Sequence, residues 1–99
     1  MELQETFCEG VCRLHVAGEM TIYSALELKP RLLGALRGSN RLELEVDGVT
    51  EVDTAGLQLL FLLKREATAT GKEMELLAPS DALQEALQQY YVNSRLENI

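Results

Sequence analysis

The sequence has little of the chemistry that metal and disulfide sites use. One histidine, His15, and two cysteines, Cys8 and Cys12, are the only imidazole and thiol groups in its 99 residues. Together they offer three soft ligands, whereas a structural zinc site takes four. Two cysteines are also too few for a disulfide framework. We therefore expect two reduced thiols that pack as small strand residues, no bound metal, and no role for His15.

The sequence also lacks a recognisable catalytic signature. A Ser-His-Asp or Cys-His arrangement would have to use His15, which lies within an expected strand and has no nucleophile motif beside it. The stretch Thr68–Lys72 superficially looks like a phosphate-binding loop. However, Glu66 stands where that motif needs glycine, and Lys72 leads into a strand rather than a helix. We predict a protein that is not an enzyme, with no catalytic residue and no cofactor.

Positive charge is scarce as well. The chain has 9 Lys and Arg residues against 16 Asp and Glu residues, which gives a formal net charge of −7. Nucleic acids and anionic membrane surfaces are bound through Lys and Arg, so we expect neither as a partner. No segment approaches the roughly 20 apolar residues of a membrane span. Residues Met1–Glu5 carry no basic and apolar export signal. We therefore expect a cytoplasmic protein without direct membrane insertion.

The patterns that are present predict one α/β domain over residues 1–99. The chain shows no repeat, linker or block of like charge, and its size allows one core and little more. Leu3–Phe7 and Val11–Val16 alternate apolar and polar residues around Glu9-Gly10, which predicts a β-hairpin. One face of the second strand carries Cys12, Leu14 and Val16, and the other carries Arg13 and His15.

The first helix has an ambiguous start. Ser24–Glu27 has the pattern of a capping box and predicts a helix that runs to about Leu36. Pro30 disagrees with this start, because an interior proline removes one helix hydrogen bond and clashes with the preceding turn. Two interpretations stay open: the helix is kinked at Pro30, or it begins at Lys29 with Pro30 in its first turn.

The second half of the chain predicts two more strands and two more helices. Leu42–Val46 alternates, with Glu43 and Glu45 on its charged face, which indicates a sheet whose helices pack mainly on one side. A helix follows over 53–70 and ends at Gly71. A short strand is predicted over Met74–Leu77, and Pro79–Asp81 opens a last helix. Asp81 and Gln84 have the spacing of a capping box for this helix. Its apolar stripe consists of Leu83, Ala86, Leu87 and Tyr90. The order β-β-α-β-α-β-α implies a four-stranded mixed sheet with right-handed crossovers.

The most informative segment joins the third strand to the second helix. Asp53 is a good N-cap and places Thr54 in the first turn, where free N–H groups and the helix dipole would attract a phosphate on the hydroxyl. Gly56 costs about 1 kcal/mol relative to alanine in a helix, so we expect something to need the space above it. An ordinary capped helix with an incidental threonine accounts for the same residues.

The same helix offers candidate contacts for a partner. Its core-facing arc consists of Leu57, Leu59, Leu60, Leu63 and Ala67. Leu62 lies outside this arc and Phe61 lies at its rim, so both are candidate anchors for a partner groove. The alternative is an incidental exposed leucine. Tyr90 and Tyr91 cannot both enter the core from one helix, and Tyr91 is either a second contact or part of the tail.

Gly18-Glu19 after the second strand, the segment Val52–Leu57 and the order of elements around them resemble the STAS domain family of bacterial anti-sigma factor antagonists. The resemblance covers essentially the whole chain. It implies a regulatory binding protein in which the hydroxyl residue after the aspartate, here Thr54, is phosphorylated by a kinase that is also the anti-sigma factor. The partner-binding residues that we infer are Asp53, Thr54, Ala55, Gly56, Phe61 and Leu62. In the family's sporulation members an aspartate stands where this chain has Thr21.

The resemblance leaves the partner open. The first hypothesis is partner switching controlled by a cognate serine/threonine kinase, the anti-sigma factor, or by a chemotaxis-associated relative. The alternative is a constitutive STAS subunit of a bacterial phospholipid-transport ATPase, in which the equivalent threonine helps to bind the ATPase. An enzyme of unknown type is the third hypothesis. The first two imply a protein partner for a monomer or weak dimer, and neighbouring genes would separate them.

Overall fold

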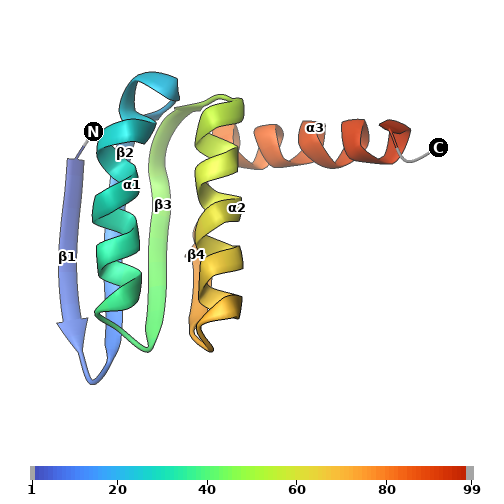
Figure 1. Cartoon of the computed structure of the whole chain (residues 1–99). Helices are drawn as coiled ribbons and strands as arrows, with labels where there is room; N and C mark the ends of the chain where they lie inside the picture. Colours follow the sequence, from blue (N-terminus) through green and yellow to red (C-terminus); the bar gives the residue numbers. More distant parts are fainter. Residues whose placement is uncertain (1, 98–99) are drawn as a thin grey trace.

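The computed structural model describes residues 2–97, in which four strands and three helices follow one another (Figure 1). They are β1 (Glu2–Cys8), β2 (Val11–Met20), α1 (Ile22–Arg37), β3 (Arg41–Val52), α2 (Thr54–Ala69), β4 (Glu73–Leu77) and α3 (Asp81–Glu97). The strands form one sheet in the order β1-β2-β3-β4. β1 is antiparallel to β2, whereas β2, β3 and β4 are parallel neighbours. The predicted α/β class, mixed sheet and element order are confirmed.

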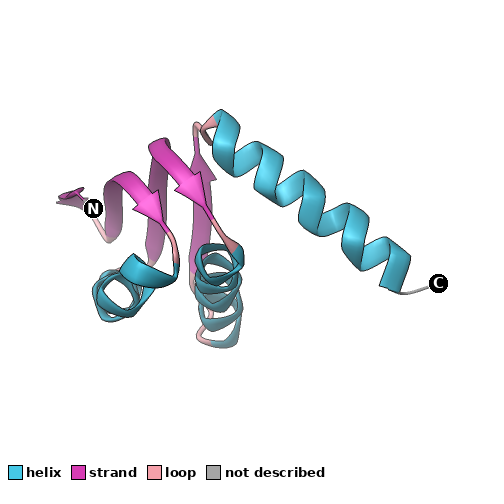
Figure 2. Cartoon of the chain, turned by 90° about the horizontal axis from the view of Figure 1, so that it is seen from above, coloured by secondary structure: helices cyan, strands magenta, loops and turns pink. Residues whose placement is uncertain are grey.

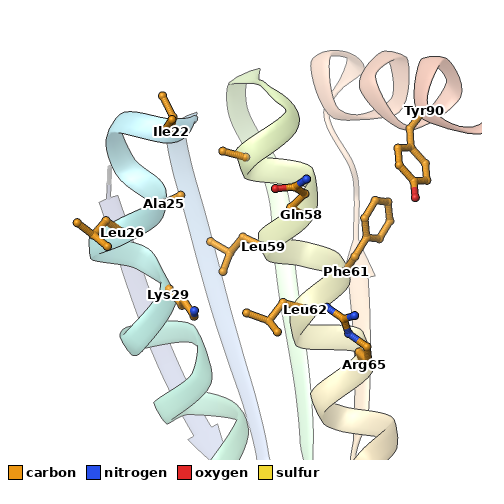
Figure 3. Close-up of a pocket in the computed structure, with 11 residues that line it drawn as sticks. Ile22, Ala25, Leu26, Lys29, Gln58, Leu59, Phe61, Leu62, Arg65 and Tyr90 are labelled. Carbon is orange, nitrogen blue, oxygen red and sulfur yellow. The ribbon is translucent and has the colours of Figure 1, made fainter. Parts of the chain in front are cut away.

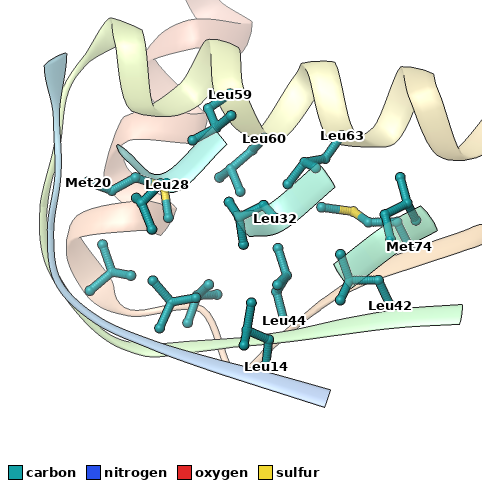
Figure 4. Packing of buried hydrophobic residues seen from close by; sticks show 14 of the residues in the cluster. Leu14, Met20, Leu28, Leu32, Leu42, Leu44, Leu59, Leu60, Leu63 and Met74 are labelled. Carbon is teal, nitrogen blue, oxygen red and sulfur yellow. The ribbon is translucent and has the colours of Figure 1, made fainter. Parts of the chain in front are cut away.

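The core lies between the sheet and two helices that cover the same face of it, α1 and α2 (Figure 2). Each layer contributes fully buried leucines, such as Leu44 from β3, Leu32 from α1 and Leu63 from α2 (Figure 4). The alternation of β2 and the predicted arc of α2 supply other core residues: Cys12, Leu14, Val16, Leu57, Leu59, Leu60 and Ala67. α3 adds Leu83 to this core and packs Ala86 and Leu87 against it, and its later turns extend away from the sheet.

The hairpin between β1 and β2 has the predicted turn. Glu9 and Gly10 both have left-handed backbone conformations, with φ values of 52° and 81°. Glycine takes this conformation without strain, so Gly10 fixes the register of the hairpin.

α1 begins earlier than the sequence suggests. Its N-cap is Thr21, and Ser24 is the third helical residue, whose Oγ accepts a hydrogen bond from the Thr21 N–H at 3.0 Å. Pro30 lies inside the continuous helix, so a start at Lys29 is wrong. The carbonyl that loses its donor to Pro30 belongs to Leu26, and both residues are exposed, so water can replace the missing bond.

The cap of α3 also differs from the prediction. Ser80 caps this helix, because its Oγ accepts a hydrogen bond from the Leu83 N–H at 3.2 Å. Asp81 is instead the first helical residue, where its charge suits the positive end of the dipole. Gln84 reaches back with its side-chain amide to the Pro79 carbonyl at 2.9 Å.

The face of the sheet opposite α1 and α2 carries the expected charges as a network of ion pairs. Arg13 contacts Glu43 at 2.9 Å, and Arg41 contacts the same glutamate at 3.2 Å. Hydrogen bonds from Arg13 and then Arg41 hold the pKa of Glu43 below its ordinary value. Glu43 keeps 15% of its side chain exposed and Glu45 keeps 36%. Arginine side chains, and not a helix, account for the shielding of Glu43.

Candidate partner-binding site

α1 and α2 begin side by side at the ends of β2 and β3, and Asp53 joins their first turns. Its Oδ1 accepts a hydrogen bond from the Gly56 N–H at 3.0 Å, which caps α2 as predicted. Its Oδ2 accepts one from the Ile22 N–H, the first residue of α1, at 2.9 Å. The bond from Ile22, followed by that from Gly56, holds the pKa of Asp53 below its ordinary value. One carboxylate therefore fixes the relative position of two helix N-termini.

Gly56 allows this arrangement by letting α2 approach β2. A Cβ atom at this position would lie 2.1 Å from the carbonyl oxygen of Met20, the last residue of β2. The expected need for space above Gly56 is therefore explained by the chain's own backbone. Gly56 is buried, so any contribution to a partner site comes from the shape that it permits.

Thr54 is the first residue of α2 and is exposed to solvent. The predicted position at the start of the helix is confirmed. The positive end of the α2 dipole lies at this residue. The N-terminus of α1 is adjacent, because Asp53 binds both helices. A phosphate on the Thr54 hydroxyl would therefore lie in a region of positive backbone potential.

A groove of about 760 Å³ runs between α1 and α2, and it begins next to Thr54 because Ala55 lines it (Figure 3). Its lining consists of Ile22, Ala25, Leu26 and Lys29 from α1, Ala55, Gln58, Leu59, Phe61, Leu62 and Arg65 from α2, and Tyr90 from α3. Ile22 is 65% exposed and Leu26 is 85% exposed. Large apolar side chains that are exposed together indicate an interaction surface.

The structure brings the predicted anchors Phe61 and Leu62 into this groove. Both are half-buried, and the Phe61 ring packs against Tyr90 with ring centroids 4.7 Å apart. Tyr91 packs edge-on against Tyr90 and is 59% exposed. Sequence reasoning missed the α1 side of the groove. The spacing of Ile22 and Leu26 by four residues places both on one face of a helix and could have indicated it. The predicted helix began after Ile22, so this pair was not recognised.

The cysteines and the histidine lie elsewhere. Cys8 is exposed and Cys12 is buried, both as free thiols. His15 contacts Asp47 at 3.2 Å on the open face of the sheet. Among residues 2–91, whose side chains the structure describes, no three His, Cys, Asp or Glu side chains come together in a way that could hold a metal ion.

Within the described part of the chain, no helix combines the length and the apolar character that crossing a membrane requires.

Structures that share this fold include several antagonists of anti-sigma factors. A putative anti-sigma factor antagonist from Thermotoga maritima matches with a TM-score of 0.80 and 17% identity over 93% of this chain and 80% of that one. Unphosphorylated SpoIIAA, an anti-sigma factor antagonist, matches with a TM-score of 0.70 and 15% identity over 99% and 100%. Phosphorylated SpoIIAA, a cell fate determinant of Bacillus, matches with a TM-score of 0.72 and 16% identity over 90% and 83%. At these identities the likeness establishes the fold.

No curated protein matches the chain significantly. A family model does, and it covers both the Asp53–Gly56 turn and the groove. This model, described as "Mlab, STAS domain", matches residues 4–97. The chain therefore belongs to the STAS domain family.

Proposed function

We propose that this STAS protein is a non-catalytic cytoplasmic regulator that binds a protein partner through the groove between α1 and α2, under the control of phosphorylation at Thr54. The observation that carries the proposal is the exposed Thr54 hydroxyl beside an exposed apolar groove. The fold is shared with SpoIIAA, which occurs in phosphorylated and unphosphorylated forms. The partner is a serine/threonine kinase of the anti-sigma factor type, or a signalling relative of it.

Charge gives the proposed switch its strength. A phosphate brings about 1.5 to 2 negative charges. It would join the Asp53 carboxylate, which is ionised at neutral pH and whose pKa is held below its ordinary value by the backbone N–H of Ile22. Two unit charges about 8 Å apart repel by about 2 kcal/mol at an effective dielectric constant of about 20. Since about 1.4 kcal/mol corresponds to tenfold in affinity, one phosphate can release a partner that places negative charge near Thr54.

The exposed apolar side chains of the groove favour a second candidate. It is the constitutive small subunit of a bacterial phospholipid-transport ATPase, the alternative that the family resemblance leaves open. The strongly exposed Ile22 and Leu26 suit this function too, because permanent interfaces are more apolar than transient ones. In this case the unmodified Thr54 hydroxyl contacts the ATPase, and no kinase is needed.

The partner can be identified in the native cell by photo-cross-linking. A photoreactive amino acid at Gln58, an exposed residue of the groove, is compared with one at Thr6, which is exposed on β1 away from the groove. We expect one protein to be cross-linked from Gln58 and not from Thr6. Equal capture from both positions would contradict a partner site in the groove.

Calorimetry with that partner then separates the two candidates. Thr54→Ala should retain the fold and bind within a few-fold of wild type, because the Thr54 side chain is exposed and Asp53 caps the helix. Thr54→Glu should weaken binding by roughly tenfold, since it fixes one negative charge at the site. If Thr54→Ala weakens binding as much as Thr54→Glu does and no kinase from the same cell labels Thr54, the constitutive subunit, which uses the hydroxyl itself, replaces the switch. If Thr54→Glu binds as tightly as wild type, the switch is wrong.

A further inference from the structure

The groove between α1 and α2 has the opposite charge to the protein as a whole. The chain has a formal net charge of −7. Among the described residues, however, the charged side chains that line the groove are Lys29 and Arg65, and both are positive. Both are exposed, and neither makes an ion pair with another described residue. Two cations are therefore available to a partner inside an apolar groove.

The dimensions of the groove match a short helix. Its lining spans residues 22–29 along α1 and 55–65 along α2. At about 1.5 Å per residue, this corresponds to a length of about 10 to 15 Å, or two to three helical turns. Figure 3 shows Lys29 and Arg65 at the end of the groove that is farther from the helix N-termini, with Leu59 and Leu62 projecting from α2 toward α1. The groove thus has an apolar floor with positive charge at one end.

The geometry points to an acidic amphipathic helix of the partner protein as the occupant of this groove. Apolar residues of that helix, spaced by three or four, pack against Leu26 and Leu62. Its carboxylates pair with Lys29 and Arg65, because these are the unpaired charges that a bound helix meets. The inference rests on the proposed function and deepens it by naming the chemistry of the partner.

The negative charge of the rest of the protein restricts the binding of an acidic helix to the groove. An acidic helix placed on most of the surface meets carboxylates, so repulsion disfavours the wrong sites. Thr54 lies at the other, N-terminal end of the groove, about 10 to 15 Å from the two cations. A phosphate there would repel only those carboxylates that the bound helix places near that end.

Peptide selection tests the inference even before the partner is identified. A displayed library of helical peptides of about four turns, with apolar positions fixed and the other positions randomised in charge, is selected on the wild-type protein. Selected peptides are synthesised, and their affinities are measured by calorimetry for wild type, Lys29→Glu, Arg65→Glu and Arg31→Glu. Arg31 is the matched control, because it is exposed on α1 and does not line this groove.

We expect the selected peptides to be net negative. Lys29→Glu and Arg65→Glu should each weaken them by roughly tenfold, and Arg31→Glu by less than about twofold. The inference is overturned if selection yields neutral peptides, basic peptides or none, or if Arg31→Glu acts as strongly as Lys29→Glu. It is also overturned if sedimentation shows a dimer that Leu26→Glu abolishes, because a second copy then occupies the groove.

The two proposals fail in different ways. If Lys29→Glu leaves the affinity of the natural partner unchanged while Thr54→Glu weakens it, the acidic helix is wrong and the switch stands. The opposite result is that acidic peptides bind through Lys29 and Arg65, while the Thr54→Glu variant has wild-type affinity for both the peptides and the partner. In that case the groove chemistry stands and control through Thr54 is wrong.

Discussion

Gly56→Ala should destabilise the protein although alanine is the better helix former. In an unobstructed helix this change gains about 1 kcal/mol. Here the new Cβ would lie 2.1 Å from the Met20 carbonyl oxygen and 3.0 Å from its carbonyl carbon. A normal contact between carbon and oxygen is about 3.3 Å, so one backbone must retreat by about 1 Å. This movement strains the bond from the Asp53 N–H to the Met20 carbonyl, which is 3.3 Å long.

Overpacking by an added methyl group costs about 1 to 3 kcal/mol, and more where backbone must move. For Gly56→Ala we therefore expect the free energy of unfolding to fall by about 2 to 3 kcal/mol. Urea unfolding measures it, with Gly34→Ala as the matched control. Gly34 also lies inside a helix, but a Cβ built there has no atom within 4 Å apart from the neighbouring backbone of its own helix. Gly34→Ala should therefore stabilise the protein by about 0.5 to 1 kcal/mol. If both variants are as stable as wild type or more so, the close approach of α2 to β2 is refuted.

Three other changes test the structure around the site and the core. Asp53→Asn should reduce the loss of stability in acid. The lowered pKa of Asp53 stabilises the fold above about pH 4, and this stability is lost as the pH falls through the lowered pKa. Urea unfolding at pH 7 and pH 3 measures the difference, and an unchanged pH dependence would contradict the role of Asp53. Lys72→Met should cost about 1 to 2 kcal/mol in a urea titration, because its Nζ donates to three carbonyl oxygens at the end of α1, at 3.1, 2.7 and 2.7 Å. Iodoacetamide at pH 8 should modify Cys8 and spare Cys12, whose pKa is raised to about 11 by burial and then by Glu5; mass spectrometry that finds both thiols modified in the folded protein would contradict this.

Local patterns are sufficient to predict most of the fold. The alternation of residues 42–46, the turn at Gly10 and the cap at Asp53 each depend on residues close in sequence, and all three are found in the structure. The predicted start of α1 is too late because its capping motif contains two hydroxyl residues, Thr21 and Ser24, and either can be taken as the cap. Local sequence does not distinguish them, whereas the long-range bond from the Ile22 N–H to Asp53 fixes the first turn of α1.

The site is predictable only on its α2 side. Thr54 follows from its place after the Asp53 cap and from the family resemblance. Phe61 and Leu62 follow from the helical periodicity, and the structure places both in one groove. The α1 side depends on how two helices are placed on the sheet, which no local pattern specifies. The bond between Asp53 and the Ile22 N–H joins residues 31 positions apart, so sequence spacing gives no sign of it.

The proposed switch depends on what a phosphate at Thr54 does to the binding of the natural partner. The chain can be prepared with phosphothreonine at Thr54 by peptide ligation, and its affinity for the partner cross-linked from Gln58 compared with that of the unmodified chain by calorimetry. Circular dichroism and urea unfolding confirm that both forms are folded. We predict binding at least about tenfold weaker for the phosphorylated chain, with unchanged stability. Equal affinities for the two forms would contradict phosphorylation control.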